Sequence, residues 1–254
     1  MMASQMILTP FFLDQPLPEL ETLEKPNWMV NRESLPKTIL VKRLGVLHAG
    51  LARKVEEALA EDRKPVSIAG DCCTAIGMLA GLTRMGIDPT LIWFDAHGDF
   101  NTWETTPSGF LGGMPLAMLA GLGEQTILET LEVDPLPQEQ IILTDARDLD
   151  PGEKELVESS LLTHLKDPLE LLEFPVPDRP LWIHFDTDVI DPAHVPAQNY
   201  PAPGGISPVE LEKVFRHLAG TRDVAAVSLS SWAPDLPGAE GSKKVCLELL
   251  EILV

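Results

Sequence analysis

Short apolar segments alternate along the chain with longer stretches in which apolar residues recur at helical spacing. Apolar runs of this length are typical of buried strands, and we predict strands over residues 6–12, 65–69, 91–95, 141–144, 181–186 and 224–229. Helical spacing and capping signals predict helices over residues 43–60, 74–84, 207–218 and 242–253. The proline-rich, acidic residues 14–38 are predicted to form an irregular connection.

Alternating strands and helices are typical of α/β proteins. Several predicted strands, such as residues 91–94, have no polar face, which indicates a mostly parallel sheet covered by helices on both sides. No internal repeat or linker divides the sequence, so residues 1–254 are predicted to form one domain. In sheets of this kind, functional sites lie beyond the carboxyl ends of the strands.

Composition limits the classes of partner. The chain carries 39 Asp and Glu against 19 Lys and Arg, a formal charge of −20, and no cluster of basic residues, so a nucleic-acid partner is not expected. No apolar run approaches the ~18 residues that a membrane span needs, and no basic stretch precedes the first apolar run as in a secretory signal. The three cysteines do not form a disulfide framework. We therefore expect a cytoplasmic protein that acts on a small molecule.

Carboxylates follow two of the predicted strands. In "WFDAHGDFN", Asp95, His97 and Asp99 occupy every second position, and in "LWIHFDTDVIDP", Asp186 and Asp188 do the same. Extended backbone places residues two apart on one face, so these side chains can converge at one edge of the sheet. Four carboxylates in one place raise each other's pKa, and two divalent cations would offset their charge. The sequence therefore predicts a metal site, and oxygen-rich ligation with an imidazole suits manganese, iron or zinc.

One histidine shares this face. His184 precedes Asp186 by two positions, which makes it a candidate metal ligand or general base. The alternative is a structural histidine that donates to a carboxylate or packs in the core. The remaining histidines are predicted to be surface or loop residues: His48, His164, His194 and His217.

These segments resemble the motifs of a known superfamily. DAHGDFN and FDTDVIDP are similar to the DAHxDxN and FDxDxxDP motifs of the arginase–agmatinase–formimidoylglutamase superfamily, the ureohydrolases, and the likeness covers most of the chain from about Val66 onward. The resemblance implies a three-layer, arginase/deacetylase-like α/β fold with an eight-stranded, mostly parallel sheet. It also implies hydrolysis of a guanidine or amidine carbon–nitrogen bond by a hydroxide bound between two manganese ions, and relatives that are often trimers or hexamers.

The resemblance also implies a ligand set. Asp95, Asp99 and Asp186 would bind one ion, Asp95 and Asp186 would be shared, and His97 and Asp188 would complete the second position. Asp99 and His184 are in addition the candidate catalytic residues.

Cys72 departs from the family pattern. It stands in "AGDCCTA" where the family's GGDHS motif has a histidine ligand of the first metal. A thiolate ligand would favour zinc or iron over manganese. The alternative is an inert, buried cysteine, in which case the first position is weak or empty and one metal is bound.

Two further departures concern the reaction. Gly112, in "PSGFLGGMP", replaces the histidine that acts in proton transfer in arginases, and Ser231, in "SLSSWAP", replaces a glutamate that pairs with the substrate guanidinium. A neutral hydroxyl cannot give the charged, bidentate pairing that a guanidinium favours. Arginine is therefore a doubtful substrate, and an amidine, another guanidine or an amide is favoured.

Other substrate-binding positions match the family. Asp150 and Glu153 fall where arginases hold the α-amino group, and Asn101 and Ser108 fall on α-carboxylate contacts, while Phe110 replaces a third, polar contact. Ser231 completes the candidate substrate-binding set. The segment "DPGE" can also be explained as a helix cap that begins at Asp150, and the two interpretations can coexist.

Three functions remain open from the sequence. The first is a metal-dependent hydrolase of a non-peptide carbon–nitrogen bond in a small, amine-bearing molecule. The second is a one-zinc, deacetylase-like amidohydrolase that uses Asp95, His97 and either Asp186 or Asp188. The third is a non-catalytic metal-binding protein or partner subunit. The complete set of carboxylate ligands favours the first, because such a cluster is costly to keep without a metal.

Overall fold

A parallel sheet forms the centre of the computed structural model, which describes residues 3–254. Within this range the sheet has eight strands in the order β4-β1-β5-β10-β9-β6-β7-β8, and each neighbouring pair is parallel. The strands are β1 (Ala3–Thr9), β4 (Met29–Val30), β5 (Arg63–Ala69), β6 (Thr90–His97), β7 (Ile141–Asp148), β8 (Thr163–Leu165), β9 (Leu181–Asp186) and β10 (Val224–Ser230). A separate antiparallel pair joins β2 (Phe11–Phe12) to β3 (Gln15–Pro16).

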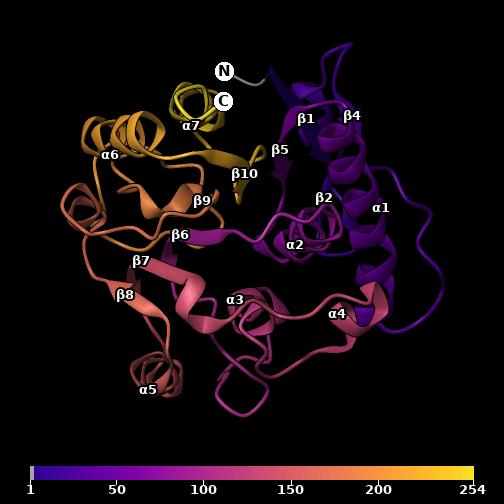
Figure 1. The fold of residues 1–254 in the computed structure, drawn as a ribbon, viewed down its shortest axis with the longest axis horizontal. Coiled ribbons are helices and arrows are strands. Elements are labelled where there is room, and N and C mark those ends of the chain that lie inside the picture. Colours follow the sequence, from indigo (N-terminus) through magenta and orange to yellow (C-terminus); the bar gives the residue numbers. More distant parts are fainter. Residues whose placement is uncertain (1–2) are drawn as a thin grey trace.

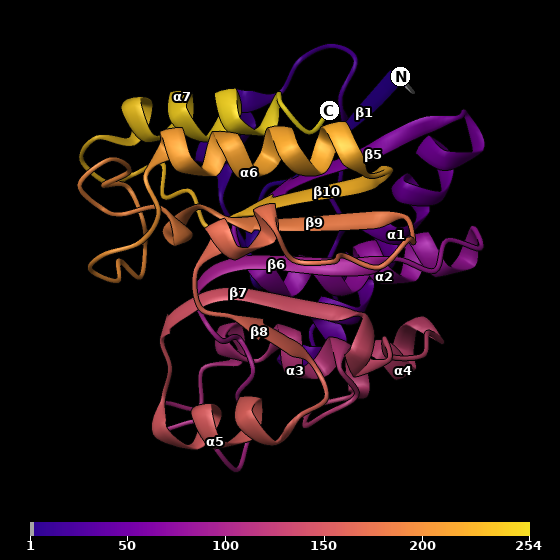
Figure 2. The ribbon, with the colours of Figure 1, turned by 60° about the vertical axis from the view of Figure 1, so that its left-hand side comes forward.

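Helices cover both faces of the sheet (Figures 1 and 2). One face carries α1 (Leu40–Ala60), α2 (Ala75–Arg84), α3 (Pro115–Leu119) and α4 (Thr126–Leu131), and the other carries α6 (Pro208–Thr221) and α7 (Ala239–Leu250). The short α5 (Pro151–Ser159) lies near the β8 edge in Figure 2. The three-layer α/β fold predicted from the sequence is confirmed.

Alternate residues of the central strands belong to two separate cores. On β6, Leu91 and Trp93 pack with the α1 and α2 side, whereas Ile92 and Phe94 pack with the α6 and α7 side. All four side chains are fully buried. A strand covered on both faces needs apolar residues at every position, which explains the continuous apolar runs in the sequence.

Several elements differ from the prediction. Residues 14–38 are not wholly irregular, because β4 within them pairs with β1 at the edge of the sheet. The short elements α3, α4 and β8 were not predicted, because three to six residues are too few to show a helical or strand periodicity in the sequence. His48 was predicted at the surface and is instead fully buried on α1, where burial lowers its pKa to about 3.

Helix starts follow the capping signals of the sequence. At α6, Ser207 accepts from the Glu210 backbone N–H and Glu210 accepts from the Ser207 N–H, and Asp150 and Glu153 form the same reciprocal pair at α5. Within residues 3–254, none of the helices combines the length and the apolar character that crossing a lipid bilayer requires.

Candidate metal centre

The carboxyl ends of four adjacent strands meet at one edge of the sheet. Strands β5, β10, β9 and β6 are neighbours in that order. The segment after β5 begins with Gly70 and Asp71 and carries Cys72, β10 leads to Ser231, and β9 and β6 end in the two carboxylate segments. Side chains that lie up to 159 positions apart in the sequence, such as Cys72 and Ser231, are therefore in contact.

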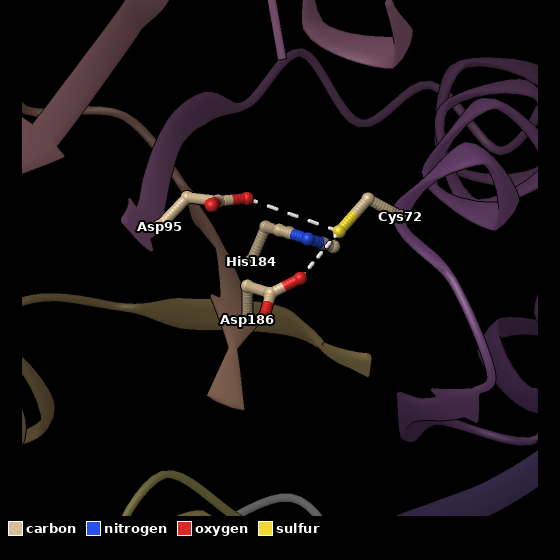
Figure 3. Close-up of side chains that lie close together, drawn as sticks. All are labelled: Cys72, Asp95, His184 and Asp186. Atoms are coloured by element: carbon tan, nitrogen blue, oxygen red, sulfur yellow. Dashed lines mark hydrogen bonds between the residues drawn. The ribbon is translucent and has the colours of Figure 1, made fainter. Parts of the chain in front are cut away.

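The first group of metal-ligating side chains comprises Cys72, Asp95, His184 and Asp186. One ligand atom of each lies within 4.8 Å of the others, and all four residues are buried. Figure 3 shows the four side chains pointing toward one another, with dashed lines joining the Cys72 sulfur to both carboxylates. The Cys72 thiol donates to Asp186 Oδ2 at 2.7 Å, and its Sγ lies 3.9 Å from Asp95 Oδ2. Burial and the Asp186 charge raise the pKa of the Cys72 thiol well above its usual range.

His184 reaches this group from the middle of β9. Its register neighbours are Trp93 on β6 and Ser228 on β10. The imidazole stacks on Trp93 with ring centroids 3.7 Å apart, and its Nδ1 lies 2.9 Å from Ser228 Oγ. Burial lowers the pKa of His184 to about 3, so the ring is neutral at neutral pH. A neutral imidazole is the form that binds metals.

The second group comprises Asp95, His97 and Asp188. His97 Nδ1 lies 3.1 Å from Asp188 Oδ2 and 3.4 Å from Asp95 Oδ1. Burial alone would lower the pKa of His97, but the Asp188 and Asp95 carboxylates outweigh it and raise the pKa to about 12. Asp95 belongs to both groups, as the ureohydrolase resemblance implies for a shared ligand.

Asp99 lies beside these groups in a bend after β6. Its backbone is left-handed, with φ of 49°, and its carbonyl accepts from the Leu116 and Ala117 N–H groups at the start of α3. The carboxylate is buried, and its Oδ2 has no hydrogen-bond partner among residues 3–254. Burial and the nearby Asp95 charge raise the pKa of Asp99 well above its usual range.

The electrostatics of the centre fit divalent cations. Burial and the Asp188 charge raise the pKa of Asp186 to about 8, and burial and the Asp95 charge raise that of Asp188 to about 6. Among the described residues, none of those that line the adjoining pocket is Lys or Arg, so the protein supplies little positive charge of its own. A buried Asp99 oxygen without a partner and a set of oxygen, nitrogen and sulfur donors are what two bound cations would satisfy.

A pocket opens over the centre. Its volume is about 190 Å³, below the roughly 300–1,000 Å³ of sites for drug-sized ligands, so it suits a small molecule. All of the candidate substrate-binding residues line it, together with Asp71, Phe12, Phe110, Asp148 and Tyr200. His184 is not among the lining residues, because it is the most deeply placed member of the first group and is buried beneath the others.

The cap interpretation of "DPGE" holds in the structure. Glu153 accepts from the backbone N–H groups of Phe100 at 2.8 Å and Asp150 at 3.1 Å, and burial raises its pKa to about 7. Asp150 accepts from Asn101 Nδ2 at 3.0 Å. Both acidic residues also line the pocket, so a structural role and a substrate contact can coexist.

Ser231 and Ser108 are turned toward the protein. Ser231 has a left-handed backbone, with φ of 68°, and its hydroxyl donates to Asp186 Oδ2. Ser108 Oγ accepts from the Phe110 N–H at 3.2 Å. Either hydroxyl that contacts a ligand would first have to give up or share a hydrogen bond.

Phe110 fills the space beside Gly112. A Cβ placed on Gly112 would overlap the Phe110 ring, so the two departures from the family pattern are complementary in space. The Phe110 ring also lies near Phe12 and Tyr200, with ring centroids 6.4 and 5.5 Å apart. This aromatic wall was missed from the sequence, because Phe12 and Tyr200 are far apart in the chain and follow no motif.

A double-mutant cycle is expected to detect this packing. Gly112→Ala should destabilise the protein by about 1 kcal/mol, the low end of the cost of overpacking because the Phe110 ring is only half-buried, and Gly112→Ala in a Phe110→Ala background should cost far less. Urea unfolding of the four proteins measures the coupling. Equal costs of Gly112→Ala in both backgrounds would show that the ring does not occupy this space.

The fold and the site together define an α/β protein with a candidate metal centre at the carboxyl edge of its sheet. The profile of the Arginase family matches residues 29–251. Arginase of Bacillus subtilis is 31% identical over 240 residues, which cover 89% of this chain and 81% of that enzyme. The N(omega)-hydroxy-L-arginine amidinohydrolase of Streptomyces lavendulae is 31% identical over 198 residues, 76% of this chain and 70% of that enzyme.

Comparison with solved structures indicates the same family. The crystal structure of arginase from Bacillus subtilis superposes with a TM-score of 0.82 at 26% identity, and the match covers 99% of this chain and 98% of that one. The chain therefore belongs to the arginase family. It is a ureohydrolase, a member of the hydrolases that act on non-peptide carbon–nitrogen bonds, and this confirms the resemblance read from its motifs.

Proposed function

We propose that this protein uses two divalent cations to hydrolyse a carbon–nitrogen bond in a small guanidino or amidino compound that carries an amine. The observation that supports this most strongly is the pair of overlapping ligand groups that share Asp95. Bound there, the cations would offset the buried carboxylate charge and activate water for attack on a trigonal carbon.

The roles of the ligands follow the two groups. We assign His97 and Asp188 to the second cation, and Cys72 and Asp99 to the first. Asp95 belongs to both ligand groups and is assigned to both cations. Asp186 is assigned to both cations on the basis of the family motif. Manganese suits the second, oxygen-rich position, and zinc or iron are the alternatives where sulfur takes part.

Asp99 is the better placed of the two candidate catalytic residues. It lines the pocket, and its Oδ2 lacks a hydrogen-bond partner among the described residues, so it can accept a proton from the attacking water. His184 does not line the pocket and is fixed by Trp93 and Ser228, which favours a role at the metal over contact with substrate.

The charge of the pocket favours a cationic substrate. Two divalent cations would offset the charge of the four aspartates that hold them. Asp71, Asp148, Asp150 and Glu153 also line the pocket, and none of the lining residues within 3–254 is Lys or Arg. An amine or amidinium group is therefore attracted to this pocket.

Arginine is disfavoured by three contacts. Ser231 is neutral and donates to Asp186, so it cannot replace a carboxylate that pairs with a guanidinium. Both ends of the Asn101 amide are occupied, by Asp150 Oδ2 at 3.0 Å and by the Thr105 hydroxyl at 2.9 Å. Phe110 offers no hydrogen bond to a carboxylate. We propose that the preferred substrate has no α-carboxylate.

The test is turnover of matched substrates by the metal-loaded protein. The panel contains arginine, its decarboxylated amine, an aryl guanidine, an amidine and an N-acetylated amine. A carboxylate-free guanidine or amidine is expected to have kcat/KM at least about tenfold above arginine, a difference of about 1.4 kcal/mol. Chelated protein is the control and is expected to be inactive.

Other outcomes identify the alternatives. Hydrolysis of the acetylated amine alone would replace this proposal with the one-zinc amidohydrolase. No turnover of any compound, with two metals bound, would indicate a non-catalytic metal-binding protein.

A trimer or hexamer is a further proposal, made by analogy with relatives. Light scattering on the metal-loaded protein tests it.

A further inference from the structure

We infer that the first metal position is a mixed sulfur, nitrogen and oxygen site, in which Cys72 and His184 bind the ion together with Asp95 and Asp186, and that it selects zinc over manganese. The inference rests on the proposed function in that it concerns the same centre. It adds His184 to the ligands and makes the two metal positions chemically unlike.

The chain fixes the direction of the Cys72 thiol. Asp71, just before it, accepts from the Cys73 N–H at 2.9 Å and from the Leu13 N–H at 2.6 Å, and the Thr74 hydroxyl donates back to the Asp71 carbonyl at 2.8 Å. These bonds hold the short helical turn Cys72–Thr74. The Cys72 sulfur consequently points into the first ligand group, where it lies 2.7 Å from Asp186 Oδ2.

The adjacent cysteine provides a contrast. Cys73 is equally buried on the same turn, but its Sγ lies 3.7 Å from the Leu111 carbonyl and it belongs to neither ligand group. Two cysteines with the same burial therefore differ in whether their sulfur reaches the carboxylates.

A stacked indole and a hydrogen-bonded serine prepare His184 as a ligand. Trp93 stacks on its ring, and the Trp182 indole donates to Ser228 Oγ at 3.0 Å. Ser228 Oγ has two acceptor lone pairs, so it can also accept from His184 Nδ1–H, 2.9 Å away. In that tautomer Nε2 carries a lone pair. The Ser230 hydroxyl lies 3.3 Å from Nε2 and would yield this lone pair to a bound metal. A ring N–H held by an oxygen behind the ligand is the usual support of metal-binding histidines.

The donor set fits zinc. One sulfur, one imidazole nitrogen and two carboxylates make four ligands, the number that zinc takes in proteins. In this set His184 takes the place that the family motif gives to Asp99, which then acts as the proton acceptor and not as a ligand. Thiolate is a soft ligand that zinc accepts and manganese does not favour. The second group, with one imidazole and two carboxylates, has no sulfur. The Cys72 thiol gives up its proton to solvent as the ion binds.

Cobalt absorption tests this inference directly. Metal-free protein is titrated with Co²⁺, which replaces zinc and gives an intense near-ultraviolet band only when a thiolate is bound. We expect the band in wild type, its loss in Cys72→Ser, and its retention in Cys73→Ser, the matched control. Cys72→Ser should also lower zinc affinity at least about 100-fold. Residues that only hydrogen-bond to a metal ligand already change metal affinity 10–100-fold, and Cys72 is proposed to bind the ion itself.

Several results of the cobalt titration would overturn the inference. No band in wild type, an equal band in Cys72→Ser, or loss of the band in Cys73→Ser alone would overturn the inference. If Cys72→Ser does not fold, X-ray absorption of zinc-loaded wild type decides, because a zinc–sulfur distance of about 2.3 Å is expected and a shell of oxygen and nitrogen alone contradicts it. Neither measurement needs turnover. Hydrolysis without sulfur ligation overturns this inference alone, and sulfur ligation without hydrolysis overturns the proposed function alone.

Discussion

Replacing Asp186 with asparagine is expected to lower kcat/KM on the order of 10³-fold or more, about 4 kcal/mol in the barrier. Asp186 ends β9, belongs to the first ligand group, and accepts from Cys72 and Ser231. An amide carries no charge, so the substitution removes a bridging anion from both proposed cations. Loss of either cation removes the groups that activate water, which explains the size of the effect.

A matched control lies near the other end of the same strand. Asp178 is exposed just before β9, and Asp178→Asn makes the same chemical change away from the centre. It is expected to retain wild-type kinetics and metal content. Steady-state kinetics and elemental analysis of both variants check the prediction. An Asp186→Asn protein that keeps two metals and wild-type kcat/KM would contradict the ligand assignment.

Metal loading is expected to produce the second large effect, on thermal stability. An ion present at about 1,000 times its Kd stabilises the folded state by about 4 kcal/mol, which for a chain of this size raises Tm by roughly 8–16 °C per ion. Metal-free protein is expected to be less stable because its buried carboxylates are then left without counter-ions.

The stability of the metal-free protein is expected to fall as the pH rises. Asp186 and Glu153 have folded pKa values raised to about 8 and about 7, above their unfolded values. The stability linked to a raised pKa is present below the unfolded value and is lost as the pH rises through the folded value. His97, raised to about 12, acts in the same direction above about pH 6.5. Metal-free protein should therefore lose stability between about pH 6.5 and 8.5.

Bound cations should reverse this slope, because their ligands bind as anions and affinity rises with pH. The difference in Tm between loaded and chelated protein is thus expected to widen from about pH 6.5 to 8.5. Differential scanning calorimetry at several pH values measures it. The lowered pKa values of His48 and His184, about 3 each, act in the opposite direction only at lower pH, outside this window. A difference in Tm that narrows over this window would be evidence against metal ligation by these acids.

Much of the fold could be predicted because its strands are buried on both faces. The runs at 91–95 and 181–186 have few polar residues, and their ends mark where each strand leaves the sheet. Short edge elements could not be predicted in this way. Strand β4 has two residues, and its place beside β1 depends on long-range pairing that no local pattern encodes.

The ligand positions were predictable for a related reason. The parallel sheet alone brings these residues to one edge, because they lie at or just beyond the carboxyl ends of β6 and β9: Asp95, His97, Asp186 and Asp188. The place of His184 required its neighbours in the sheet, since stacking on Trp93 and contact with Ser228 hold the ring against the ligands.

The aromatic wall could not be predicted at all. It depends on how the β2–β3 pair and two loops come together over the pocket, and Phe12, Phe110 and Tyr200 belong to segments with no shared pattern. Its relation to Gly112 also appears only in space, because the missing side chain and the ring that fills its place are two residues apart on one short turn.

The central claim is that this centre holds two divalent cations, and metal content tests it most directly. Protein loaded with both zinc and manganese, then freed of unbound metal, is analysed for elements per chain. We predict two ions per chain, with zinc in the Cys72 position and manganese in the His97 position. A value of one ion per chain, or none, would contradict the binuclear centre on which the proposed reaction depends.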